Sequence, residues 1–147
     1  MAFKNILVAI DGSKESDRAV EVAVELAEKL GSKITFLHVV SLPEFAETRI
    51  VDDKIEKKIQ DALVDAGKKI LGRATRISQA KRVSASEKLV VGYPSTTIET
   101  EAGKLGADLI VMGSKGTAGV RRMLIGSTAE KVIRFSSIPV LVIKMGE

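Results

Sequence analysis

The sequence contains no cysteine and no tryptophan, and its aromatic residues are four phenylalanines and one tyrosine. Without cysteine, disulfide bonds and thiolate metal sites are excluded. A single histidine, His38, argues against a histidine-based metal site. No apolar run approaches the roughly 18 residues that a membrane-spanning helix needs, and the N-terminal segment does not match a secretory signal. We therefore expect a cytoplasmic protein with no membrane partner.

The length of 147 residues fits one domain, residues 1–147, which buries roughly 70% of the surface of the unfolded chain. The net charge of +4 comes from one stretch, because residues 54–82 hold nine Lys or Arg and three acidic residues. That stretch has no aromatic side chain on which nucleic-acid bases could stack. We interpret it as a solvated helix face and disfavour nucleic acid as a partner.

Apolar runs of strand length alternate along the chain with segments of helical periodicity. Five strands are predicted, over residues 4–10, 33–40, 82–91, 108–112 and 138–144. Helices are expected over 13–30, 50–71, 96–105 and 127–135, with a loop over 41–49 and a short helical turn over 118–124. This alternation is typical of an α/β protein with a parallel sheet and helices on both faces.

Residues with local capping chemistry set the expected helix ends. Ser13 is predicted to cap the first helix, and the pairs Thr96–Glu99 and Ser127–Glu130 are read as capping boxes that begin the third and fourth helices. The second helix is expected to end near residue 71, because Gly67 and Gly72 weaken it.

Two glycine turns carry the main functional signal. The run Gly113-Ser114-Lys115-Gly116 follows a buried-strand pattern, and Gly126-Ser127 comes after nine further residues. Glycine allows a close approach of the backbone to phosphate, and the N–H groups of a helix start attract anions. The chain has no G-x-x-x-x-G-K-[ST] loop, so it is not a P-loop NTPase. It also has no G-x-G-x-x-G run after the first strand, which argues against a dinucleotide enzyme. The pattern indicates nucleotide phosphate binding.

In an open parallel sheet, ligands bind beyond the carboxyl ends of the strands. Asp11 ends the first strand there, and its carboxylate could accept a ribose hydroxyl or hold Mg²⁺ between phosphates. Ala9, Ile10 and Met112 would add apolar walls. His38 lies within an apolar strand, and we interpret it as a packed, hydrogen-bonded side chain rather than a catalytic one.

The glycine pattern, G-x-x-G followed after nine residues by G-S, resembles the ATP-binding branch of the universal stress protein family. Residues 6–13, 37–40 and 138–143 also resemble that family, in the expected order, so the resemblance covers almost the whole chain. It implies a doubly wound, Rossmann-like sheet of five parallel strands in the order 3-2-1-4-5. It also implies a homodimer formed by antiparallel pairing of the strand 138–144.

The resemblance further implies ATP, ADP or AMP as ligand, with Mg²⁺ as a companion. Val39 would grip adenine through its main chain, Asp11 would be the acid of the site, and Ser127 and Thr128 would touch phosphate. The full expected set is Ala9, Ile10, Asp11, Val39, Met112, Gly113, Ser114, Lys115, Gly116, Gly126, Ser127 and Thr128.

These residues favour a nucleotide-binding stress-response or signalling module. One alternative is a slow ATPase or nucleotidyl-transfer enzyme; besides Asp11 no general base is evident near the phosphates, so fast hydrolysis is not expected. A second alternative is a nucleotide-free scaffold that binds a protein or nucleic acid through the basic stretch 54–82.

Overall fold

The computed structural model of the chain describes residues 3–41, 52–115 and 125–145. The described strands are β1 (Asn5–Ala9), β2 (Lys33–Val40), β3 (Ala85–Val91), β4 (Leu109–Gly113) and β5 (Val140–Ile143). The described helices are α1 (Lys14–Leu30), α2 (Asp53–Ala80), α3 (Pro94–Leu105) and α4 (Ser127–Phe135). The expected loop from residue 42 onward and the helical turn over 118–124 lie outside the described ranges.

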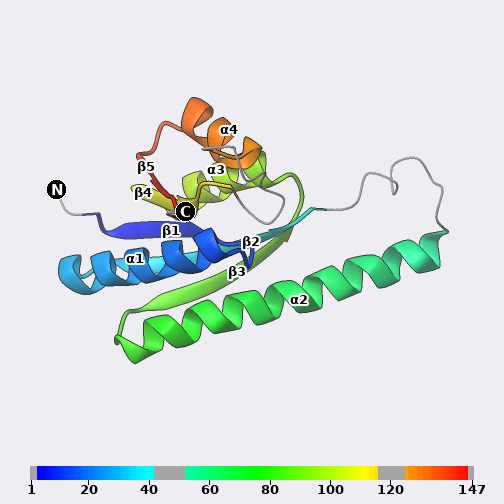
Figure 1. Ribbon diagram of the computed structural model, residues 1–147, viewed down its shortest axis with the longest axis horizontal. Helices are drawn as coiled ribbons and strands as arrows, with labels where there is room; N and C mark the ends of the chain where they lie inside the picture. Colours follow the sequence, from blue (N-terminus) through cyan, green and yellow to red (C-terminus); the bar gives the residue numbers. More distant parts are fainter. Residues whose placement is uncertain (1–2, 42–51, 116–124, 146–147) are drawn as a thin grey trace.

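The five strands form one parallel sheet in the order β3-β2-β1-β4-β5, which confirms the predicted topology (Figure 1). The central strand β1 pairs with both β2 and β4, and its last residue, Ala9, lies opposite Leu37 on one side and Met112 on the other. The carboxyl ends of these three strands therefore meet at one edge of the sheet. At this edge the connection after β1 leads to α1 on one face of the sheet, and the connection after β4 leads to α4 on the other. Open α/β sheets bind ligands at such a point.

Two apolar cores lie on the two faces of this sheet. Alternate strand residues such as Val8 and Phe36 pack with α1 and the C-terminal half of α2. Their neighbours Leu7 and Leu37 pack with α3 and α4 on the other face. Figure 1 shows the two helix pairs on opposite sides of the sheet. The alternation explains the continuous apolar runs of the inner strands, because both faces of each strand are buried.

Helix α1 begins and ends where the sequence predicts. The Ser13 hydroxyl accepts a hydrogen bond from the Ser16 N–H at 3.1 Å, as an N-cap does. Gly31 ends the helix in the left-handed conformation, with φ of 72°, and its N–H donates to the Ala27 carbonyl.

Helix α2 differs from the prediction, since it runs from Asp53 to Ala80 instead of ending near residue 71. Tertiary packing overrides the low helix propensity of glycine here. Gly67 is buried against the sheet, and the inward stripe continues through Leu71, Ala74 and Ser78, all buried. Because the helix is longer, β3 begins later in the chain than predicted, at residue 85 rather than 82.

Both predicted capping boxes are wrong. Helix α3 begins at Pro94 with Tyr93 in the N-cap position, and α4 begins at Ser127 with Gly126 in the N-cap position; neither has a side-chain capping bond. Proline favours the first position of a helix because its φ is already helical, so α3 starts before the Thr96–Glu99 pair. Ser127 is thus the first helical residue and has no capping role.

Among the helices of the described residues, none combines the length and apolar character needed to cross a membrane.

A candidate nucleotide site at the sheet edge

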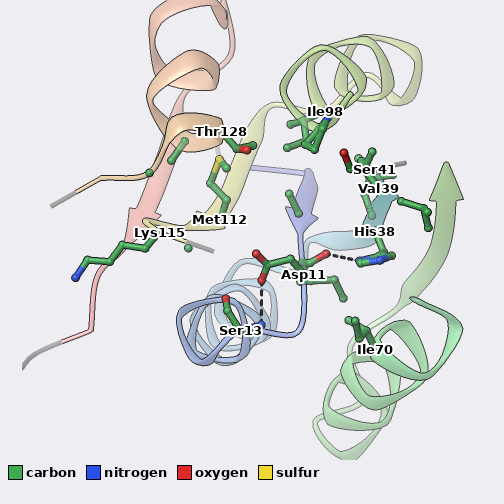
Figure 2. Close-up of a pocket in the computed structure, with 18 of the residues that line it drawn as sticks. Asp11, Ser13, His38, Val39, Ser41, Ile70, Ile98, Met112, Lys115 and Thr128 are labelled. Atoms are coloured by element: carbon green, nitrogen blue, oxygen red, sulfur yellow. Dashed lines mark hydrogen bonds between the residues drawn. The ribbon is translucent and has the colours of Figure 1, made fainter. Parts of the chain in front are cut away.

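A cavity of about 570 Å³ opens at the carboxyl ends of β1, β2 and β4. Residues of the three strand ends form its floor, and residues of α2, α3 and the start of α4 form its walls (Figure 2). A volume of this size is typical of sites for small ligands, which take about 300–1,000 Å³.

The cavity brings the predicted site residues together. All the predicted residues that the structure describes line it: Ala9, Ile10, Asp11, Val39, Met112, Gly113, Ser114, Lys115, Gly126, Ser127 and Thr128. The remaining member of the set, Gly116, lies outside the described residues.

The loop after β1 fixes the position of Asp11. Its Oδ1 accepts a hydrogen bond from the Ser13 N–H at 2.9 Å, and its own N–H donates to the Ser16 hydroxyl at 3.0 Å. Figure 2 shows the Asp11 side chain near the middle of the site. Of the described residues that line the cavity, Asp11 alone carries a carboxylate.

The start of α4 supplies backbone donors to the cavity. The Glu130 N–H donates to the Gly126 carbonyl at 3.0 Å, which is the first bond of the helix. The N–H groups of Ser127, Thr128 and Ala129 come before it, so they have no intrahelical acceptor, and all three residues line the cavity. Since no side chain of the described residues caps this end, the N–H groups and the positive end of the helix dipole are suited to an anion.

Ser114 adds a polar group beside this helix end. The residue is only 1% exposed, and its hydroxyl has no hydrogen-bond partner among the described residues. A buried polar group of this kind is uncommon, and one that lines a cavity can be satisfied by a ligand. The backbone is firmly held, because the Ser114 carbonyl accepts from the Gly126 N–H at 2.5 Å.

The two described glycines of the motif serve close backbone packing. A Cβ at Gly113 would lie 2.7 Å from the Cβ of Glu15 and 3.0 Å from the Ser16 nitrogen, in the first turn of α1. A Cβ at Gly126 would lie 2.8 Å from the Lys115 carbonyl oxygen. Glycine at these positions brings the ends of α1, β4 and α4 together around the cavity.

The opposite end of the cavity combines apolar side chains with His38 and Ser41. In Figure 2, Val39, Ile70 and Ile98 lie on one side of Asp11, and Thr128 and Lys115 lie on the other. The Lys115 side chain extends away from the other labelled residues.

Several lining residues lie outside the set of site residues predicted from the sequence. The further lining residues are Ser13, Leu37, His38, Val40, Ser41, Leu63, Ala66, Ile70, Pro94, Ile98 and Ala129. Those of α2 and α3 belong to the apolar faces of these helices, and their spacing predicts burial against the sheet. It does not indicate which of these residues lie beyond the strand ends and line a cavity.

No cluster of three or more metal-ligating side chains occurs in residues 3–41, 52–115 and 125–145. A divalent cation here would therefore depend on Asp11 together with oxygens of a bound ligand. Mg²⁺ commonly binds in this way, through one or two carboxylates, substrate phosphates and water.

Comparison with known proteins identifies the family of this chain. The sequence profile of the "Universal stress protein family" matches residues 2–144. The chain is 33% identical to "Universal stress protein YxiE" of Bacillus subtilis, over 97% of this chain and 99% of that protein.

Solved structures agree. The structure of the hypothetical protein MJ0577 superposes with a TM-score of 0.88 at 26% identity, covering 100% of this chain and 99% of that one. Two similar structures hold adenine nucleotides. A universal stress protein in complex with cAMP has a TM-score of 0.72 at 26% identity and covers 98% of both chains. That of Archaeoglobus fulgidus, in complex with dAMP, has a TM-score of 0.66 at 28% identity and covers 98% and 100%. The chain belongs to the universal stress protein family.

Proposed function

We propose that the cavity binds an adenine nucleotide, with ATP and Mg²⁺ as its resident ligands, and that the protein acts as a nucleotide-dependent module of a stress response. The observation that carries the proposal is the pairing of an uncapped helix start with the unpartnered Ser114 hydroxyl at one end of a ligand-sized cavity. Relatives at 26% and 28% identity that hold cAMP and dAMP support the choice of base.

The two ends of the cavity suggest how the nucleotide lies. Its phosphates would face the N–H groups at the start of α4 and the hydroxyl of Ser114, where the donors are. The base would lie among Val39, Ile70 and Ile98. Asp11, between the two ends, would accept a ribose hydroxyl or hold the magnesium ion.

The donors present are sufficient for useful affinity. Hydrogen bonds to charged oxygens contribute about 1.5–3 kcal/mol each. Three from α4 contribute about 4.5–9 kcal/mol. With burial of the base added and several kcal/mol lost in immobilising the ligand, the sum is compatible with the roughly 8 kcal/mol of micromolar binding. Micromolar affinity for the nucleotide therefore does not depend on a lysine or arginine side chain.

Calorimetric titration of nucleotide-free protein with ATP and Mg²⁺ tests the proposal, with ADP and AMP in parallel. The informative variant is Ser127→Pro, because proline is favoured at the first helical position and removes one N–H that faces the cavity. The matched control Ser127→Ala removes only the hydroxyl. We expect saturable micromolar binding by the intact protein and weaker binding by Ser127→Pro. Absence of saturable binding by the intact protein would overturn the proposal.

We also propose that the protein is a homodimer paired through β5. Strand β5 forms one edge of the sheet, all four of its residues are half-buried, and its sequence Val-Leu-Val-Ile carries no charge. An uncharged apolar edge invites pairing with another strand. The opposite edge, β3, carries Glu87 and Lys88, which disfavour such pairing.

A further inference from the structure

We propose that His38 is a positioning residue of this site, which holds the backbone from which Asp11 reaches the ligand. The inference rests on the proposed nucleotide binding and adds a residue to it. His38 is the sole histidine of the chain and lines the cavity, half-buried, at the end of β2.

The imidazole is tied to the end of β1. Its Nδ1 lies 2.8 Å from the carbonyl oxygen of Ile10. Figure 2 draws a hydrogen bond of His38 as a dashed line. A carbonyl oxygen only accepts hydrogen bonds, so Nδ1 carries the proton and donates.

The same peptide unit is held from its other side. The N–H that follows the Ile10 carbonyl belongs to Asp11, and it donates to the Ser16 hydroxyl at 3.0 Å. The peptide plane between Ile10 and Asp11 is thus fixed by one side chain from β2 and one from α1. Because the Cα of Asp11 belongs to this plane, its orientation decides where the Asp11 carboxylate points.

The ring itself has no room to move toward α2. A Cβ on Gly67 would lie 2.5 Å from Cδ2 of His38 and 3.1 Å from Nε2, so α2 approaches the ring as closely as a residue without a side chain permits. The contact also limits how closely α2 can pack on the sheet. Leu63 and Ile70 of this helix form a wall of the cavity. A leucine at position 38 could fill this space, but it would not donate to Ile10.

The test is a double-mutant cycle on ATP affinity, measured by calorimetry with Mg²⁺. We expect His38→Leu to weaken binding about five- to tenfold, the loss of one hydrogen bond. His38→Asn should bind within about twofold of the intact protein, because its amide can donate from near the position of Nδ1. If His38 acts through Asp11, His38→Leu should have less than about a twofold effect in an Asp11→Ala background.

A matched control comes from the other end of β1, where the buried Ser32 hydroxyl donates to the Phe3 carbonyl. Ser32→Ala removes a comparable side-chain-to-backbone bond far from the cavity, and we expect it to lower the midpoint of urea unfolding without changing ATP affinity. Additive effects of His38→Leu and Asp11→Ala, or equal weakening by Ser32→Ala, would overturn the role of His38 alone. Failure of the intact protein to bind ATP would overturn the proposed function and this inference together.

Discussion

Ser114 carries a cost in the folded protein that a ligand would relieve. Its hydroxyl is buried and finds no partner in the described part of the chain, and such a group destabilises the fold by roughly 1–3 kcal/mol. We therefore expect Ser114→Ala to leave the free energy of unfolding unchanged or to raise it by about 1 kcal/mol in nucleotide-free protein. The same change should weaken ATP binding several-fold. Urea unfolding and calorimetry measure the two effects separately.

Ser78 offers a matched control for that experiment. It is also fully buried, but its hydroxyl donates to the Thr75 carbonyl at 2.7 Å. Ser78→Ala should lower stability by about 1 kcal/mol and leave ATP affinity intact. A loss of stability in Ser114→Ala as large as that in Ser78→Ala would contradict the assignment of Ser114 as a ligand-facing group.

At the residue scale, the sequence predicted which residues meet at the sheet edge but not what each one contacts. Gly113 was predicted as a phosphate-loop glycine, and the structure adds that a side chain there would collide with α1. The wall residue Ile70 falls within the helix expected over 50–71, and its spacing does not mark it as a cavity residue. Such contacts join segments far apart in the chain, so neither composition nor local spacing reports them.

Helix α2 contains two glycines in opposite surroundings. A Cβ at Gly67 would meet His38 at 2.5 Å and Leu89 at 2.9 Å, whereas at Gly72 the nearest atom is a flexible one, Nη1 of Arg76, at 3.7 Å. Alanine is favoured over glycine in a helix by about 1 kcal/mol, and overpacking costs about 1–3 kcal/mol. Gly72→Ala should therefore stabilise the protein, and Gly67→Ala should destabilise it. Thermal and urea unfolding of the pair measure this, and equal effects would refute the close approach of α2 to the sheet.

Two serines at helix starts differ in whether their side chains cap the helix. Ser13 accepts a hydrogen bond from the Ser16 N–H, so Ser13→Ala should lower the free energy of unfolding by about 1 kcal/mol. Ser127 makes no capping bond, so Ser127→Ala should change it by less than about 0.5 kcal/mol. Urea unfolding distinguishes them. A loss with Ser127→Ala as large as that with Ser13→Ala would restore the capping-box interpretation.

At the scale of elements, the periodicity of the sequence predicts the bounds of the strands and of α1 to within a few residues of those in the structure. The predicted end of helix α2 lies nine residues before the observed one, because helix propensity does not report that Gly67 packs closely against the sheet. The capping boxes failed for a related reason. Their side-chain pattern is present, but Pro94 begins α3 earlier, and α4 begins one residue before its box requires.

At the scale of the whole molecule, alternating strand and helix patterns predict a parallel sheet with two helical layers. They do not determine the order of the strands, which came from the resemblance to the family and which the structure confirms. Once the order is known, the site follows from geometry, because β1 and β4 become neighbours and their carboxyl ends bring the Asp11 loop and the glycine turns to one cavity.

The free edge of β5 leads to a prediction about assembly. The carbonyls of Pro139 and Ile143 accept hydrogen bonds at 2.9 Å each from N–H groups of β4 and of the residue directly after it. The N–H and C=O groups of the alternate residues Val140 and Val142 therefore point to the open edge. Val142→Pro should remove an outward donor while leaving the bonds to β4 in place. The exposed side chain of Met145, two residues after this strand, would be covered by a partner.

We expect the intact protein to sediment as a dimer at micromolar concentration and Val142→Pro as a folded monomer. The matched control is Val91→Pro on the opposite edge strand, β3. The Gly92 N–H donates inward to the Val40 carbonyl, so that of Val91 points outward, and this change should preserve the dimer. The antiparallel pairing of two β5 strands would join two sheets into one across a twofold axis, because a strand can pair with its own copy only in a self-complementary register. A monomeric intact protein, or a Val142→Pro variant that remains dimeric with its circular dichroism unchanged, would show that β5 is not the interface.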